Sequence, residues 1–252
     1  MKGAALSMII ESQKRKPIKS IIVVVVVLAL VGGGIGLYFA LRGGDIKGTY
    51  ELIEFGGIEW RVLERQGDKA LLLSEWIIDR RAYLEKEEGK EEDEERETTW
   101  EHSDIRHWLN NDFYNRFSAE DKGRIAETHV TNSDNPWFHT LGGNNTIDQV
   151  FLLSLEEMVQ YFGDSGQLEN RPSETTYSIS DLFRYDDARV AYEAITPRWR
   201  WMRSGTPKEW WLRSPGGNQF GAAQIFAIGE IHVYGISCSK HAGIRPAMWV
   251  AL

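Results

Sequence analysis

The stretch Ile21–Leu41, IIVVVVVLALVGGGIGLYFAL, decides the expected architecture because it contains 21 residues without a charged side chain. A helix of this length spans about 30 Å, the thickness of the hydrocarbon core of a bilayer. A cleaved signal peptide is the alternative. It would have a shorter apolar stretch followed by small residues at the cleavage site, and LYFAL is a poor site of that kind. The sequence therefore predicts an uncleaved transmembrane helix over residues 21–41.

The charges beside this stretch predict its orientation. Four basic residues lie between positions 14 and 19, whereas Arg42 alone follows the stretch closely. The positive-inside rule then places residues 1–20 in the cytoplasm as a tail. We expect a linker over 42–48 and an extracellular domain over 49–252, in a single-pass protein of the cell membrane. Gly32-x-x-x-Gly36 is a weak signal for a homodimer through the membrane helix.

Composition excludes several function classes. The net charge is −8 over 252 residues, and the first 42 residues carry +5, which leaves −13 for the remainder. A domain this acidic has no electrostatic footprint for nucleic acid, so we expect no nucleic-acid partner. Cys238 is the one cysteine, which excludes an internal disulfide framework and a cysteine-rich metal site. We expect no cofactor.

Residue patterns after position 49 predict an α+β domain with mixed short strands and two main helices. Glycine-bounded apolar runs predict the strands, and Gly229-Glu230 predicts a two-residue hairpin turn between Ala222–Ile228 and Ile231–Ile236. Serine or threonine followed three residues later by an acid predicts helix starts. The strands are expected at 49–55, 58–63, 70–78, 210–213 and 243–250, and the helix starts at Thr98, Ser118 and Ser154. We expect the run 58–63 to pair with 247–252.

Two motifs, Trp210–Gly216 (WWLRSPG) and Gly243–Trp249 (GIRPAMW), resemble an uncharacterised domain family of Gram-positive bacteria. Weaker matches include Trp60–Leu63 and Asp148–Ser154, and together they cover about residues 58–252. That family is similar to the C-type-lectin-like fold, which formylglycine-generating enzymes share. The resemblance implies two helices, a small sheet that joins both ends of the domain, and a long loop region for ligands. It implies no activity.

The candidate ligand-binding residues are Trp199, Trp201 and Arg203. They lie in an irregular region, where loops carry function, and Trp and Arg are frequent contact residues. The alternative is a loop that its own tryptophans hold on the core. A second group is expected to be structural, with its buried guanidinium groups bound to backbone or carboxylate oxygens. This group comprises Trp210, Trp211, Arg213, Arg245 and Pro246.

Other patterns have plain structural interpretations. The acid-rich run 85–97 predicts a solvated surface loop, and Ser133–Trp137 predicts an Asx-type turn rather than a calcium-dependent sugar site. Cys238-x-x-His241 is weak evidence for a nucleophile and base, because a lone thiol in a strand is usually a small buried apolar group. The six histidines form no His-x-x-x-His pair, so no metal site is expected and no catalytic residue is assigned.

These observations favour a membrane-anchored bacterial surface protein with a non-catalytic, lectin-like domain that binds or displays a glycan or protein ligand. The alternative is an enzyme of the formylglycine-generating fold with a different chemistry. A His–acid or metal cluster in a deep cleft would favour the enzyme, whereas an aromatic-lined surface would favour binding. A sensory ectodomain is disfavoured, because the predicted cytoplasmic tail carries no signalling domain.

Overall fold

The computed structural model describes residues 50–85, 98–163, 188–193 and 206–252. The chain divides into two units, Met1–Lys47 and Gly48–Leu252, and all described residues belong to the second. Within the described ranges, no helix has the length and hydrophobicity needed to cross a bilayer. The predicted helix 21–41 lies outside these ranges. The prediction of single-pass membrane anchoring with a cytoplasmic N-terminus is corrected, because the finding on the helices does not support it.

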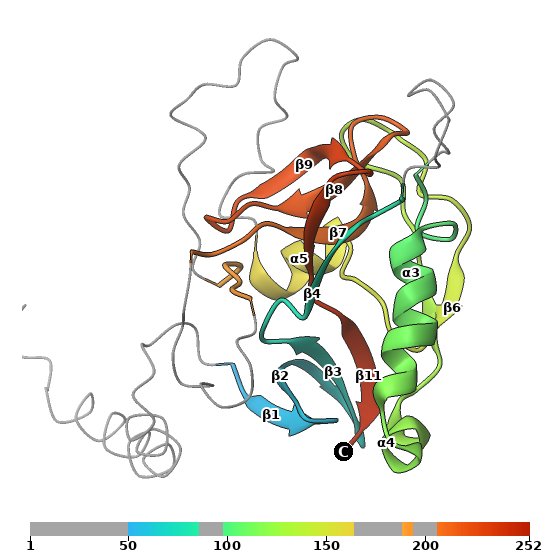
Figure 1. Cartoon of the computed structure of the whole chain (residues 1–252), viewed down its shortest axis with the longest axis vertical. Helices are drawn as coiled ribbons and strands as arrows, with labels where there is room; N and C mark the ends of the chain where they lie inside the picture. Colours follow the sequence, from blue (N-terminus) through green and yellow to red (C-terminus); the bar gives the residue numbers. More distant parts are fainter. Residues whose placement is uncertain (1–49, 86–97, 164–187, 194–205) are drawn as a thin grey trace, which may run out of the picture. The chain divides into compact units, whose positions relative to one another are not determined.

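The first sheet has four antiparallel strands in the order β1-β2-β3-β11 (Figure 1). Gly56 and Gly57 form the tight β1–β2 turn, where both have positive φ angles of 57° and 75° that glycine adopts without strain. The C-terminal strand pairs with β3 and not with the run 58–63, so the predicted direct pairing is wrong, although both strands belong to this sheet. The strands are β1 Leu52–Phe55, β2 Ile58–Gln66, β3 Lys69–Ser74 and β11 Ala247–Ala251.

The second sheet has five strands in the order β4-β10-β7-β8-β9. Its β10–β7 pair is parallel, and the other pairs are antiparallel. The predicted β8–β9 hairpin is present, but residues 226–230 connect its strands, where the pattern predicted a two-residue turn. The strands are β4 Asp79–Ala82, β7 Trp210–Pro215, β8 Gly221–Ile225, β9 Ile231–Ser237 and β10 His241–Ile244.

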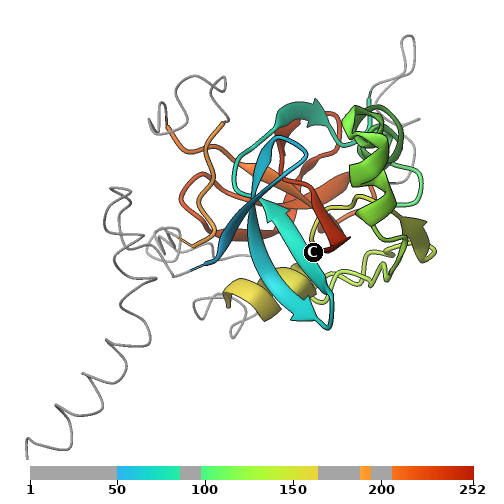
Figure 2. The same cartoon turned by 90° about the horizontal axis from the view of Figure 1, so that it is seen from below.

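A column of short helices runs beside the two sheets (Figures 1 and 2). The helix α5 contacts both sheets, through Tyr161 and Glu64 of β2 and through Glu157 and Arg213 of β7. Serine caps start three of these helices: Ser103 before α3, Ser118 before α4, and Ser154, which forms the predicted capping box with Glu157. The helices are α3 Asp104–Trp108, η2 Leu109–Phe113, η3 Tyr114–Arg116, α4 Ala119–Arg124 and α5 Leu155–Phe162. A two-stranded sheet pairs β5 Thr128–Val130 with β6 Thr146–Asp148.

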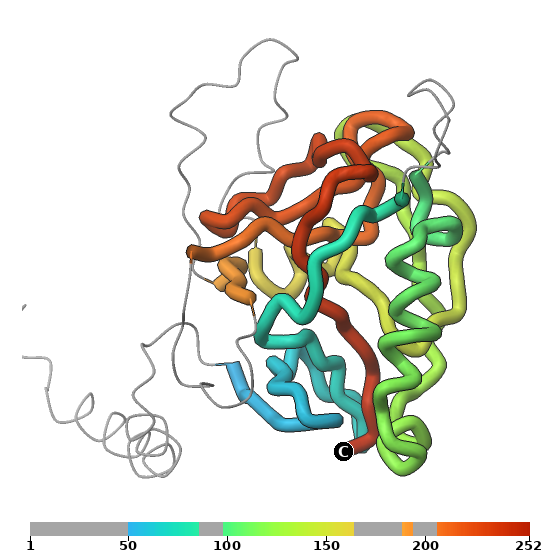
Figure 3. The backbone as a smooth tube through the Cα atoms, in the orientation of Figure 1, coloured from blue at the N-terminus to red at the C-terminus, as the bar shows by residue number. Residues whose placement is uncertain are grey.

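The predicted fold class is wrong: the described domain is mostly β-sheet, and its helices are few and short. Where the pattern predicts a first main helix, the structure has the short consecutive elements α3, η2 and η3, followed by α4. The second main helix is α5, which has eight residues. The apolar spacing from Ile105 to Phe113 does bury one face, since both residues are in the core. The backbone tube shows how the two sheets and this column follow one another along the chain (Figure 3).

Candidate functional site

A cavity of about 400 Å³ opens where three loops meet. One loop precedes α3, the second joins β5 to β6, and the third joins β7 to β8; the last two loops come together in Figure 1. The lining residues are Thr98, Thr99, His139, Thr140, Leu141, Asn218, Gln219 and Phe220. We call this cavity the three-loop pocket. Its volume falls within the usual range for small-molecule sites.

Asn135 holds the β5–β6 loop on the second sheet. Its side chain is fully buried, and the amide Nδ2 lies 2.9–3.1 Å from the carbonyl oxygens of Pro215, Gly216 and Val233. Its Oδ1 atom accepts hydrogen bonds from the backbone N–H groups of residues 137 and 138. This is the predicted Asx-type turn, and here it ties three distant segments together.

Residues 142–145, near the end of this loop, form hydrogen bonds with residues 132–134 at its beginning. Gly142 N donates to Asp134 Oδ1 at 2.9 Å, and Asn132 bonds both to the Asn145 side chain and to the Asn144 carbonyl. A Cβ atom on Gly142 would lie 2.3 Å from the carbonyl oxygen of Asn132, so no other residue fits there without backbone movement. The pocket wall formed by residues 139–141 is therefore built on a fixed loop.

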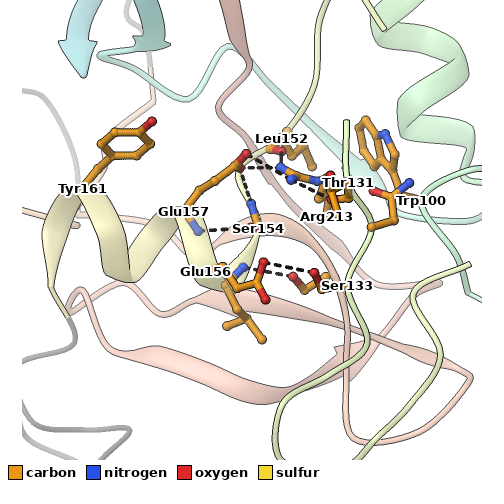
Figure 4. Close-up of polar contacts among 12 residues, drawn as sticks. Trp100, Thr131, Ser133, Leu152, Ser154, Glu156, Glu157, Tyr161 and Arg213 are labelled. Atoms are coloured by element: carbon orange, nitrogen blue, oxygen red, sulfur yellow. Dashed lines mark hydrogen bonds and ion pairs between the residues drawn. The ribbon is translucent and has the colours of Figure 1, made fainter. Parts of the chain in front are cut away.

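An ion pair between a buried arginine and a partly exposed glutamate anchors the start of the same loop to α5 (Figure 4). Arg213 of β7 pairs with Glu157, and it donates hydrogen bonds to the carbonyl oxygens of Leu152 and Thr131. Ser133 donates to the carboxylate of Glu156 at 3.0 Å. The Arg213 side chain is 4% exposed, so these contacts replace the water that the guanidinium would otherwise bind.

The β7–β8 loop is packed against Tyr234 of β9. Gly217 N donates to the Tyr234 carbonyl oxygen at 2.7 Å, and a Cβ atom on Gly217 would lie 2.2 Å from the Tyr234 ring. The Asn218 amide lies 3.3 Å from the Tyr234 hydroxyl oxygen. Asn218 Oδ1 also accepts from the backbone N–H of Phe220, which fixes that residue at the pocket wall.

The remaining walls come from Thr98, Thr99 and His139. Thr98 N donates to the Gln219 carbonyl oxygen at 2.7 Å, which joins the first loop to the third. Thr99 Oγ1 lies 3.0 Å from Nδ1 of the exposed His102. His139 has a φ angle of 58°, a region that few side chains adopt, and strained backbone of this kind often occurs at functional sites.

The described lining is nearly uncharged, and most of its accessible surface is apolar. Hydroxyl and amide groups come from three threonines, an asparagine and a glutamine, and apolar surface comes from Leu141 and Phe220. His139 is the one ionisable side chain among the described lining residues. These described residues offer hydrogen-bond donors and acceptors, and none of them carries a fixed charge for binding an anion or a cation.

The family model for Domain of unknown function (DUF6273) matches residues 67–252. The chain belongs to the DUF6273 family. The match begins at the β2–β3 turn and covers the remainder of the chain, including all three loops of the pocket. No curated protein and no solved structure matches the chain. The lectin-like resemblance and the Gram-positive origin inferred from the sequence are not confirmed.

The predicted ligand-binding residues Trp199, Trp201 and Arg203 lie outside the described residues. The pattern analysis did not find the three-loop pocket, although it did examine Ser133–Trp137. The density of Asn, Asp and Gly between positions 131 and 145 predicts a loop there, but it does not predict that the loop is held rigidly. Such residues form side-chain-to-backbone turns, which can hold a loop rigidly as well as leave it mobile.

The predicted structural residues of the DUF6273 domain are buried, and they lie away from the pocket lining. The Trp210 indole donates to the Arg189 carbonyl oxygen, and the Trp211 indole donates to the Arg81 carbonyl oxygen. Pro246 follows β10, and its carbonyl oxygen accepts from Ser74 N at 2.9 Å.

Arg245 is fully buried and its guanidinium lies 4.8 Å from the centre of the Trp210 ring. Its Nε donates to the Ser74 carbonyl oxygen at 3.0 Å, whereas Nη1 and Nη2 have no hydrogen-bond partner among the described residues. Desolvation and the nearby Arg61 lower the pKa of Arg245 to about 9. Unlike Arg213, it relies on the aromatic ring and one carbonyl oxygen for stabilisation.

The other residues considered for chemistry, Cys238 and His241, are not among the described residues that line the pocket. Cys238 is buried at the end of β9, and His241 begins β10. The searched part of the domain contains no group of three or more His, Cys, Asp or Glu side chains that could hold a metal ion. Of the acid-rich run 85–97, Glu85 alone is described, and its backbone N–H donates to Asp104.

Proposed function

We propose that this DUF6273 domain is a binding module that takes a neutral glycan in the three-loop pocket. One observation carries the proposal: the described walls of a cavity of about 400 Å³ consist of hydroxyl, amide and apolar side chains, and His139 is the one ionisable group among these described lining residues. Sugar rings present hydroxyl groups at their edges and C–H groups on their faces. Short polar side chains beside an aromatic ring match that surface.

The rigidity of the pocket supports binding. Asn135, Gly142 and the Arg213–Glu157 pair fix the loops from which the walls are built. Preorganised walls lower the entropy lost when a ligand binds, so useful affinity does not need a large buried surface. The proposal draws on this geometry and not on the resemblance to the C-type-lectin-like fold.

The test compares two exposed apolar side chains. Leu141 is 69% exposed and lines the pocket, whereas Ile147 is 58% exposed on β6 and is not a lining residue. We would titrate the full-length chain with chitotriose, cellotriose and maltotriose and follow its NMR spectrum. At least one trisaccharide should bind with a millimolar or lower Kd.

Leu141→Glu should weaken that binding at least about tenfold, which corresponds to about 1.4 kcal/mol, because it puts a carboxylate at an uncharged wall. Ile147→Glu is the matched control and should leave the Kd unchanged. The proposal is wrong if none of the three sugars binds, or if both variants weaken binding equally.

A further inference from the structure

Three aromatic side chains lie in a row beside the three-loop pocket: Trp137, Phe138 and Tyr234. The Trp137 and Phe138 rings have centroids 6.4 Å apart, and the Phe138 and Tyr234 rings have centroids 5.4 Å apart at an angle of 86°. We call these three residues the aromatic row. Its rings form edge contacts with one another, so each ring holds its neighbour in place.

The aromatic row is joined to the pocket at two points. Phe138 precedes the wall residue His139 in the chain, and the Tyr234 hydroxyl oxygen lies 3.3 Å from Nδ2 of the wall residue Asn218. A ligand that fills the pocket and continues past Asn218 therefore meets Tyr234 next.

Tyr234 combines exposure with a fixed position. It is 45% exposed, one of four large apolar or aromatic side chains in the described residues with such exposure. Its ring nevertheless packs on Gly217, where there is no room for a Cβ atom, and its hydroxyl and one ring edge contact Asn218 and Phe138. A held aromatic ring gives large contact area at low entropic cost, which is typical of binding surfaces.

We propose that Tyr234 is a second subsite, so that the domain binds a glycan chain that extends beyond the pocket rather than a single terminal sugar. This inference depends on the proposed function of the pocket. Phe138 supports the ring from the side, and Trp137 packs in turn against Phe138. A chain is the occupant that fits, because a single sugar would fill the pocket and leave the adjacent exposed ring unused.

The experiment measures how affinity depends on chain length. The full-length chain is titrated with the mono-, di-, tri- and tetrasaccharide of whichever series binds in the pocket test. The trisaccharide should bind about twofold to tenfold more tightly than the monosaccharide, the gain expected from one aromatic contact. Tyr234→Leu keeps apolar volume over Gly217 but removes the ring face. It should abolish this gain, so that the trisaccharide and the monosaccharide bind with equal Kd.

Two further variants distinguish the role of the Tyr234 ring from that of its hydroxyl, and the second subsite from the pocket. Tyr234→Phe removes the hydroxyl that contacts Asn218 and should keep the dependence on chain length, whereas Leu141→Glu should weaken binding of every length. If no sugar binds, the proposed function itself fails. If sugars bind but Kd does not change with length, or if Tyr234→Leu weakens all lengths equally, the second subsite is wrong and the pocket proposal stands.

Discussion

Replacement of Asn135 by alanine should destabilise the domain more than any other single change at an asparagine in the β5–β6 loop. The side chain is fully buried, its amide hydrogens are shared among three carbonyl oxygens, and its Oδ1 accepts two backbone N–H groups. Two donated and two accepted bonds, at about 1 kcal/mol each, give a loss of about 4 kcal/mol. The backbone groups left behind are buried and have no replacement partner.

Urea unfolding followed by tryptophan fluorescence measures this loss directly. A loss of that size should also lower Tm by about 10 °C in a domain of this length. Asn111→Ala is the control, because Asn111 is exposed and makes one local bond to the His107 carbonyl oxygen. That variant should change stability by less than about 0.5 kcal/mol. If Asn135→Ala costs less than about 1 kcal/mol, the loop is not held as we describe.

Asn135→Asp gives an independent check through its pH dependence. A carboxylate placed against three carbonyl oxygens has its folded-state pKa raised, because the protonated form alone can donate to them. The variant is then most stable at low pH and loses stability as pH rises from about 4. A variant that grew more stable over that range would contradict the assigned amide orientation.

Three further predictions concern other parts of the domain. Arg213→Met should destabilise it by about 1–3 kcal/mol, because the carbonyl oxygens of Leu152 and Thr131 lose their buried donor; urea unfolding measures the loss. Burial lowers the pKa of His232 from 6.5 to about 4. The contribution of neutral His232 to the free energy of unfolding is therefore fully present above pH 6.5 and is lost as the pH falls towards 4. His232→Phe should reduce the dependence of the urea midpoint on pH over this range. Gly142→Ala should lower Tm and abolish sugar binding because its Cβ meets backbone, whereas Gly123→Ala, in open space on α4, should raise stability by about 0.5–1 kcal/mol.

Local signals in the sequence predicted local structure well. The capping patterns at Ser118 and Ser154 start helices where expected, and the β8–β9 hairpin is present. Thr98 is the instructive exception. Its pattern fits a capping box, but α3 starts after Ser103, and Thr98 N bonds to Gln219 instead. The conformation of the segment at Thr98 is set by a tertiary contact, which no local sequence pattern encodes.

The candidate site could not have been predicted from patterning, because distant segments build it. Asn135 reaches Val233 across 98 positions, and the pocket walls come from three separate loops. The fold class failed for a related reason. The short run Asp79–Ala82 carries a weak strand signal alone and becomes a strand by pairing with β10, which lies about 160 positions later in the chain.

The late strands β10 and β11 have a consequence for how the chain acquires its structure during synthesis. Each adds to a sheet whose other members include strands made much earlier, and the bond from Arg245 to Ser74 spans 171 positions. Neither sheet has its full set of strands until the ribosome has produced this region. Contacts of such long range slow folding, and a nascent chain arrested before residue 241 would expose unpaired edges that attract other chains.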